Sequence, residues 1–184
     1  MKAAMLALIA VALTGCSASK PAHNVGFGAA RSLRELDGTY RNLGETDPRH
    51  TRNEYLSGII WPGLGEAEHP AIRTIVVTAL GDTALSVVAR DSSGVAREQT
   101  FIRGKDFEFN DGRLQLKTVW KNSLKEPEAG GLFFVRTTQE LGVDKKGQGK
   151  FKKRDVVAGA AYLVVPIAYT ESDEVRFIRI EEGP

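Results

Sequence analysis

Short segments with alternating apolar and polar residues recur through most of this chain and constrain its fold more than any other feature. In the run 113–120, Leu114 and Leu116 alternate with polar neighbours, which is the period-two pattern of a half-buried strand. Other strand-like runs are 72–79, 85–90, 107–109, 132–141, 156–169 and 175–180. Since we find no sustained helical period, the chain is predicted to be all-β.

Turn-forming residues separate these runs. The strongest hairpin signal is Asn110-Asp111-Gly112, because Asp111 and Gly112 tolerate the positive φ that a tight turn needs. About eight strands joined in this way predict an antiparallel meander, which either closes as a barrel or splits into a sandwich. We favour a small barrel or partly open barrel, with Pro166 at an edge, a bulge or a strand end.

Length and composition fit one globular domain, which we place at 33–184. The chain has 184 residues, of which 42% are hydrophobic and 26% are charged. Its formal net charge of +2 argues against a nucleic-acid-binding protein. Cys16 is the only cysteine, so an internal disulfide is excluded and stability must come from burial and backbone pairing.

The first sixteen residues have the layout of a secretion signal. Lys2 supplies one positive charge, and the eleven residues 3–13 form an uninterrupted apolar run. Such a run is too short to cross about 30 Å of hydrocarbon as a helix, but it suits a signal peptide. The run ends in Leu13-Thr14-Gly15-Cys16, in which a small residue precedes the cysteine.

This ending resembles the lipobox of bacterial lipoproteins. The resemblance implies that 1–15 is a removed signal peptide and that the Cys16 thiol receives acyl chains such as palmitate, which anchor the protein to a lipid bilayer. A plain secreted protein with an incidental cysteine is the alternative. Ser17, rather than Asp, follows Cys16, and by the same resemblance this favours the outer membrane, facing the periplasm. The small and polar residues of 16–32 predict a flexible tether.

The opening of the domain carries two further resemblances. The stretch Leu36-Asp37-Gly38-Thr39-Tyr40 resembles the first strand of lipocalin-like barrels, in which an aromatic residue closes one barrel end. It also resembles uncharacterised proteobacterial envelope lipoproteins that open with Gly-Thr-Tyr. An ordinary turn followed by a strand explains the same five residues. Neither resemblance implies an activity.

Two features are candidate contact sites. Six basic residues fall within ten positions of a glycine-containing segment that is expected to be a mobile loop: Lys145, Lys146, Lys150, Lys152, Lys153 and Arg154. They predict a contact with anionic lipid or an acidic partner, or else a solvated loop. Trp61 lies in a glycine-rich segment and predicts a pocket lip or a partner contact, or else a loop that folds its Trp side chain over one barrel end.

No residue pattern predicts catalysis, a metal or another cofactor. His23, His50 and His69 lack ligand spacing, although Glu66 and Glu68 lie near His69.

The sequence leaves two candidate functions open, and neither of them is enzymatic. A binding module for a lipid or amphipathic ligand requires an internal cavity lined by Leu, Val and Phe. A structural or interaction lipoprotein, which holds a protein or polymer partner at the membrane, requires an exposed apolar or charged patch.

Replacing the cysteine tests the anchor. A Cys16→Ser variant is expected to leave the membrane fraction, because the acylated thiol is lost, and labelled palmitate is expected to enter only the parent chain. Cell fractionation and metabolic labelling provide the measurements. Retention of the variant in the membrane to the same extent as the parent would contradict the lipobox interpretation.

Overall fold

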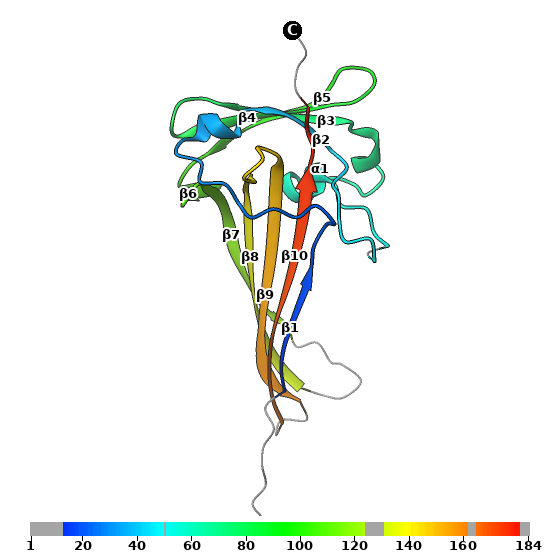
Figure 1. Cartoon of the computed structure of the whole chain (residues 1–184), viewed down its shortest axis with the longest axis vertical. Coiled ribbons are helices and arrows are strands. Elements are labelled where there is room, and N and C mark those ends of the chain that lie inside the picture. The colour runs from blue at the N-terminus through cyan, green and yellow to red at the C-terminus, as the bar shows by residue number, and fades with distance from the viewer. Residues whose placement is uncertain (1–12, 50, 124–130, 162–164, 181–184) are drawn as a thin grey trace, which may run out of the picture.

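The computed structural model describes residues 13–49, 51–123, 131–161 and 165–180, which form two β-sheets (Figure 1). The six-stranded sheet has the order β1-β10-β9-β8-β7-β6 and consists of β1 (Leu13–Ser19), β6 (Phe107–Asn110), β7 (Arg113–Ser123), β8 (Gly131–Val143), β9 (Gly149–Ala161) and β10 (Val165–Phe177). The five-stranded sheet has the order β11-β2-β3-β4-β5 and consists of β2 (Gly38–Arg41), β3 (Thr74–Ala79), β4 (Ala84–Arg90), β5 (Val95–Ile102) and β11 (Arg179–Ile180).

The helices of the described residues are short. They are the 3₁₀ helices η1 (Leu33–Leu36) and η2 (His69–Ala71) and the α-helix α1 (Leu56–Ile60). Over the described part of the chain, no helix has the length and apolar character to cross a membrane. Since the described residues form two sheets and only short helices, the all-β prediction is confirmed.

The two sheets share one continuous segment but are not closed into a barrel. Strand β10 runs through Phe177 and Ile178 directly into β11, which pairs with β2. At the other side, the only pairing found between the β5 end and β6 is an isolated bridge from Arg103 to Phe107, within the described residues. The strand order is thus that of a meander whose chain passes from one sheet to the other between β10 and β11. The predicted barrel wall is interrupted between β5 and β6.

Local sequence signals place the hairpins correctly. Strand β6 ends at Asn110 and β7 begins at Arg113, so Asp111 and Gly112 alone form the predicted turn. Their φ angles of 51° and 75° lie in the left-handed region. In β4 the predicted alternation is present, with Leu85, Val87 and Ala89 buried.

The three longest strands extend beyond the five-stranded sheet and form a stalk (Figure 1). We define the stalk as residues 131–137 of β8, 155–161 of β9 and 165–171 of β10, which pair with one another in register. The opposite ends of the same strands carry Val143, Phe151 and Phe177, which belong to the buried core between the sheets.

The N-terminal segment does not form the predicted flexible tether. Its first part is strand β1, which pairs in parallel with β10 and places Cys16 in register with Thr170. Further along, the backbone N–H of Gly28 donates to Val143 O at 2.8 Å, and Phe27 bridges to Asp144. The prediction was wrong because this segment is held by backbone hydrogen bonds and polar contacts, which need little apolar burial. Residues 1–12 of the predicted signal peptide lie outside the described residues.

Asn42 is the centre of a buried polar network that joins α1 and η2 to β2. Its side chain has 0% exposure. The Nδ2 group donates to His69 O at 2.7 Å and to Ile72 O at 3.0 Å, while Oδ1 accepts from Ser57 N at 2.8 Å. One amide thus satisfies three backbone groups that would otherwise be buried without a partner.

Removing this amide is expected to destabilise the fold strongly. An Asn42→Ala variant should have a free energy of unfolding lower by about 3 kcal/mol, because several buried backbone groups lose their partner at once. Chemical denaturation provides the measurement, and Asn53→Ala provides a control at an exposed amide whose side-chain hydrogen bond is long, 3.4 Å to Tyr55 Oη. Equal stabilities of the two variants would contradict this assignment.

Candidate ligand-binding cavity

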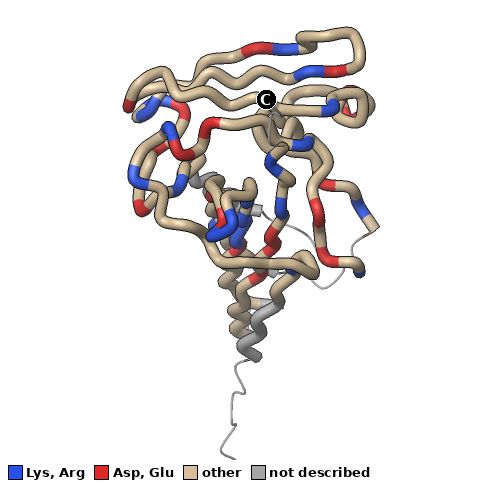
Figure 2. Tube along the Cα trace, turned by 45° about the horizontal axis from the view of Figure 1, so that its top comes forward, with Lys and Arg blue, Asp and Glu red and all other residues tan. Residues whose placement is uncertain are grey.

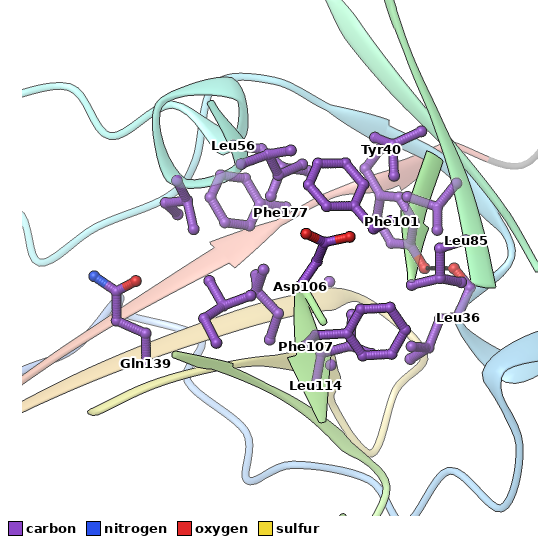
Figure 3. A pocket seen from close by; sticks show the side chains of 18 of the residues that line it. Leu36, Tyr40, Leu56, Leu85, Phe101, Asp106, Phe107, Leu114, Gln139 and Phe177 are labelled. Carbon is purple, nitrogen blue, oxygen red and sulfur yellow. Dashed lines mark hydrogen bonds between the residues drawn. The ribbon is translucent and has the colours of Figure 1, made fainter. Parts of the chain in front are cut away.

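A cavity of about 350 Å³ lies where the two sheets face each other (Figure 3). The five-stranded sheet contributes Tyr40, Val77, Leu85, Val87 and Phe101. The six-stranded sheet and the helices contribute Leu36, Leu56, Ile59, Ile60, Phe107, Leu114, Leu116, Leu141 and Phe177. Alternation predicts the inward direction of many of these side chains. It does not predict that the sheets remain far enough apart to leave a space.

Few polar groups reach this cavity. Lys105, Asp106, Gln139 and Lys150 are the charged or amide side chains among its lining residues. Figure 3 shows Asp106 among the apolar side chains and Gln139 at one end of the group. The Asp106 carboxylate accepts from the backbone N–H of Ile102 at 2.8 Å, so part of its hydrogen-bonding capacity is already used. An apolar space with a few polar groups is typical of small-molecule sites.

Tyr40 closes one part of the lining and is fixed in place. Its hydroxyl donates to Leu36 O at 2.8 Å, and its ring is 5% exposed. Burial is the main factor that raises the pKa of Tyr40, against the lowering effect of the nearby Arg179 guanidinium. The phenol therefore remains neutral and serves as a wall of the cavity.

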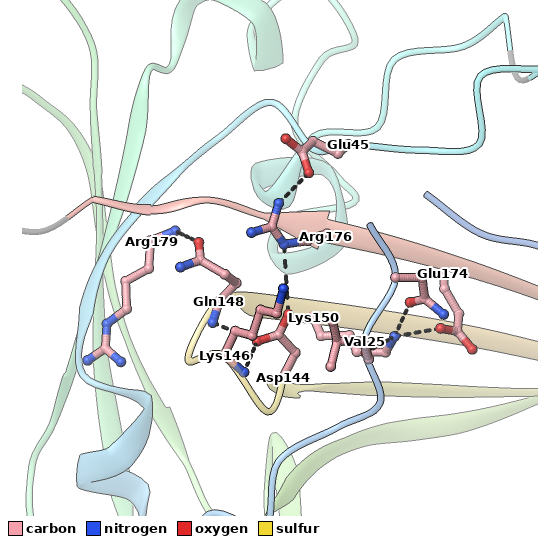
Figure 4. Close-up of polar contacts among 10 residues, drawn as sticks. Val25, Glu45, Asp144, Lys146, Gln148, Lys150, Glu174, Arg176 and Arg179 are labelled. Atoms are coloured by element: carbon pink, nitrogen blue, oxygen red, sulfur yellow. Dashed lines mark hydrogen bonds and ion pairs between the residues drawn. The ribbon is translucent and has the colours of Figure 1, made fainter. Parts of the chain in front are cut away.

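Lys150 is buried in an ion pair beside the cavity. Its Nζ lies 2.5 Å from Glu174 Oε2 and donates to Val25 O at 2.8 Å; Asn24 Oδ1 is a third partner (Figure 4). Lys150 and Glu174 are 4% and 7% exposed. The pair joins β9, β10 and the N-terminal segment.

The charge state of Glu174 follows from opposing effects. Burial raises the pKa of its carboxyl, but the hydrogen bond and positive charge of Lys150, together with the charge of Lys152, lower it further than burial raises it. The net pKa lies below its ordinary value of 4.5. Glu174 is therefore ionised in the folded protein at neutral pH, as its partner Lys150 requires.

The six predicted basic residues do not form one contact surface. Lys150 is buried against Glu174, Lys152 lies 3.7 Å from the same carboxylate, and Lys153 lies 2.9 Å from Asp155 Oδ2. Lys145 and Lys146 are exposed in the turn between β8 and β9, and Arg154 is exposed in the middle of β9. Alternation along a strand sends neighbouring side chains to opposite faces, which separates residues that are close in sequence.

The predicted mobile loop is also shorter and more ordered than expected. Strand β9 begins at Gly149, so only 144–148 connect the strands. Asp144 Oδ1 accepts from Lys146 N at 2.7 Å and from Gln148 N at 2.9 Å, which fixes the turn (Figure 4). Gly147 adopts a φ of 75° there.

Trp61 is not an exposed contact residue. Its side chain is 4% exposed, its Nε1 donates to Gln99 Oε1 at 2.7 Å, and the Arg97 guanidinium lies 5.5 Å from the ring centroid. Trp61 thus packs on β5 at the end of α1, while its neighbour Pro62 lines the cavity. The alternative prediction, a loop that folds the Trp side chain over one barrel end, agrees with this burial, although the two sheets form no closed barrel.

A buried Ser–His pair was not predicted from the sequence. Ser57 Oγ lies 3.0 Å from His69 Nδ1, and the Tyr55 ring stacks on the imidazole. A hydroxyl beside an imidazole is the arrangement of a nucleophile and its base. Ser57, however, has 0% exposure and a backbone N–H bound to Asn42, so the pair supports the packing of α1.

Among the described residues, no group of three or more His, Cys, Asp or Glu is suited to a metal ion. His50 lies outside them.

Comparisons with known proteins add no family. A search of protein-family models, of curated proteins and of solved structures finds no match to this chain. The similarities at 13–16 and 36–40 therefore remain resemblances.

The buried ion pair is expected to make stability depend on pH. Because the folded-state pKa of Glu174 is depressed, its contribution is present above the unfolded-chain value of about 4.5 and is lost as the pH falls through the lower folded-state pKa. A Glu174→Gln variant should therefore be less stable at pH 7, and its free energy of unfolding should fall less steeply between about pH 5 and pH 3. Denaturant titrations across this range measure both effects, with Glu171→Gln on the exposed part of β10 as control. Parallel curves for the parent and Glu174→Gln would rule out this role.

Proposed function

We propose that the protein is a membrane-anchored envelope lipoprotein that holds an apolar or amphipathic ligand, such as a lipid, between its two sheets. The observation that carries this proposal is the apolar cavity of about 350 Å³, to which both sheets contribute leucine, valine and phenylalanine side chains. A volume of this size lies at the small end of known ligand sites. It suits a single chain or small ring rather than a whole phospholipid.

The chemistry of the lining favours an apolar ligand body. Side chains that face an empty space forgo van der Waals contacts, and an apolar ligand restores those contacts on both walls. Removing the ligand's own apolar surface from water adds about 25 cal/mol per Å². Gln139 and Lys105, which also line the cavity, offer donors to a polar end of the ligand.

The interaction lipoprotein is the other candidate, and we rank it second. It requires an exposed patch, for which Trp61 and the six basic residues were the sequence candidates. Trp61 is buried, and the basic residues are dispersed over two strand faces and a turn. Anchoring itself, and the outer membrane as its place, are proposed from the lipobox-like ending at Cys16.

Filling the cavity is expected to weaken ligand binding. A Val77→Trp variant places an indole in the space and should weaken binding of the apolar fluorophore N-phenylnaphthylamine by about tenfold or more. Thr78→Trp is the matched control, because Thr78 is the next residue of β3 and is exposed on its other face. Fluorescence titration, with palmitate as competitor, measures affinity, and circular dichroism shows whether each variant is folded.

Two outcomes would decide against the proposal. Equal affinity of the parent, Val77→Trp and Thr78→Trp would place the fluorophore elsewhere. If Val77→Trp fails to fold, Ile60→Trp enters the cavity from α1 and serves the same test. Unchanged binding by that folded variant would likewise exclude the cavity as the site.

A further inference from the structure

The charged residues of the stalk end at one level across the three long strands. Glu171 of β10 is in register with Asp155 of β9, which is in register with Thr137 of β8, one residue from Arg136. Beyond this level, 131–135, 156–161 and 165–170 contain no charged residue, although the neighbouring β7 places Lys121 in register with Val135. In Figure 2 the blue and red segments of these strands lie toward the two sheets, and tan segments lie nearer the end of the stalk.

One face of the stalk combines exposed apolar side chains with exposed arginines. We define the docking face by positions that share one side of the paired strands: Phe134, Arg136, Arg154, Val156, Ala158 and Ala168. Phe134 is 47% exposed and Val156 is 37% exposed, and Ala158 and Ala168 are also exposed. The docking face therefore combines an apolar end with two exposed arginines.

The opposite face has a mixed character. It carries Val157, which is 6% exposed, and Tyr169, which is 37% exposed. Where charge begins, its Asp155 carboxylate lies 2.9 Å from Lys153 Nζ, and Glu171 is exposed. An anionic surface would therefore attract the two exposed arginines of the docking face, whereas the opposite face offers an exposed carboxylate.

The residue proposed to carry the lipid lies at the same level. Cys16 is in register with Thr170, Thr170 with Val156, and Val156 with Arg136. Because β1 is paired with β10 rather than detached as a tether, acyl chains on Cys16 would enter the bilayer beside the last charged residues of the stalk. The bilayer surface is then next to the docking face.

The length and edges of the stalk exclude a membrane-spanning arrangement. From Val156 to Ala161, β9 advances about 17 Å at about 3.3 Å per residue, against a hydrocarbon core of about 30 Å. An open sheet also leaves edge N–H and C=O groups that hydrocarbon cannot satisfy. In the headgroup layer, water and lipid polar groups satisfy them, so the face can lie flat there.

We propose that the docking face lies on the bilayer that carries the anchor, with its apolar end in the interfacial layer and Arg136 and Arg154 on anionic headgroups. This inference rests on the proposed anchoring through Cys16, but not on the cavity. It gives the protein a fixed orientation on the membrane instead of free rotation on a tether.

An environment-sensitive fluorophore tests the orientation. Since the Cys16 thiol is occupied by acyl chains in the lipoprotein, an Ala158→Cys substitution adds one reactive thiol on the docking face, which is labelled with nitrobenzoxadiazole. The control is Glu171→Cys, which is on the opposite face and three residues along β10 from Ala168, the register partner of Ala158. Each labelled lipoprotein, with acylation verified by mass spectrometry, is reconstituted in vesicles of phosphatidylethanolamine with or without phosphatidylglycerol.

The expected result is a blue-shifted, severalfold brighter emission at position 158 in vesicles, quenched by spin-labelled lipid, while position 171 remains water-like. An added Arg154→Glu substitution should reduce the signal at 158 in vesicles with phosphatidylglycerol. Water-like emission at 158 in an acylated protein would overturn the docking and leave the anchor intact, whereas an unacylated chain would overturn both. A shift that needs no vesicles and grows with protein concentration would identify a second copy as the occupant, and this too would overturn the proposal.

Discussion

The passage of one chain segment from the first sheet into the second determines the rest of the architecture. Phe177 ends β10 in the core, and two residues later Arg179 pairs with Tyr40 of β2. The O atom of Ile178 between them accepts from Arg41 N at 2.8 Å, so the corner is held by the backbone. Because the sheets are joined at this corner and are bridged only at Arg103–Phe107 on the other side, among the described residues, their inner faces stand apart and enclose the cavity.

The buried ion pair adds a constraint that apolar packing alone does not supply. Lys150 and Glu174 face each other across β9 and β10, and Lys150 also binds Val25 O. A buried charge is costly unless it is paired, so these strands can keep only the observed register without exposing one partner to an apolar environment. A slip of one strand by one residue would move its charge to the other face and separate the pair. The same pair ties down the segment that leads from Cys16 to the domain.

Local chemistry explains which parts of the fold were predictable. Asp111-Gly112 and the alternation in β4 are determined by neighbours in the sequence, and both were predicted correctly. The division into two sheets depends on the corner at 177–179, for which no local signal exists. The tether was predicted wrongly because edge pairing by β1 uses backbone groups, which every sequence possesses. The basic residues were grouped by sequence distance, although Lys150 and Arg154 have entirely different burial. The cavity depends on the spacing of whole sheets, which single residues do not encode.

The two proposed sites lie on the same strands, and this bears on how a ligand reaches the cavity. Leu141 of β8 lines the cavity, and Arg136 of the same strand lies at the level of Cys16. Five residues separate them, which is about 17 Å along an extended strand. If the docking face lies on the bilayer, the cavity stands little more than one leaflet's thickness from the lipid surface. An apolar ligand that moves between bilayer and cavity then has a short exposed path, which reduces the cost of transferring its apolar surface through water. A long flexible tether would not maintain this proximity, since it would allow the cavity to face any direction.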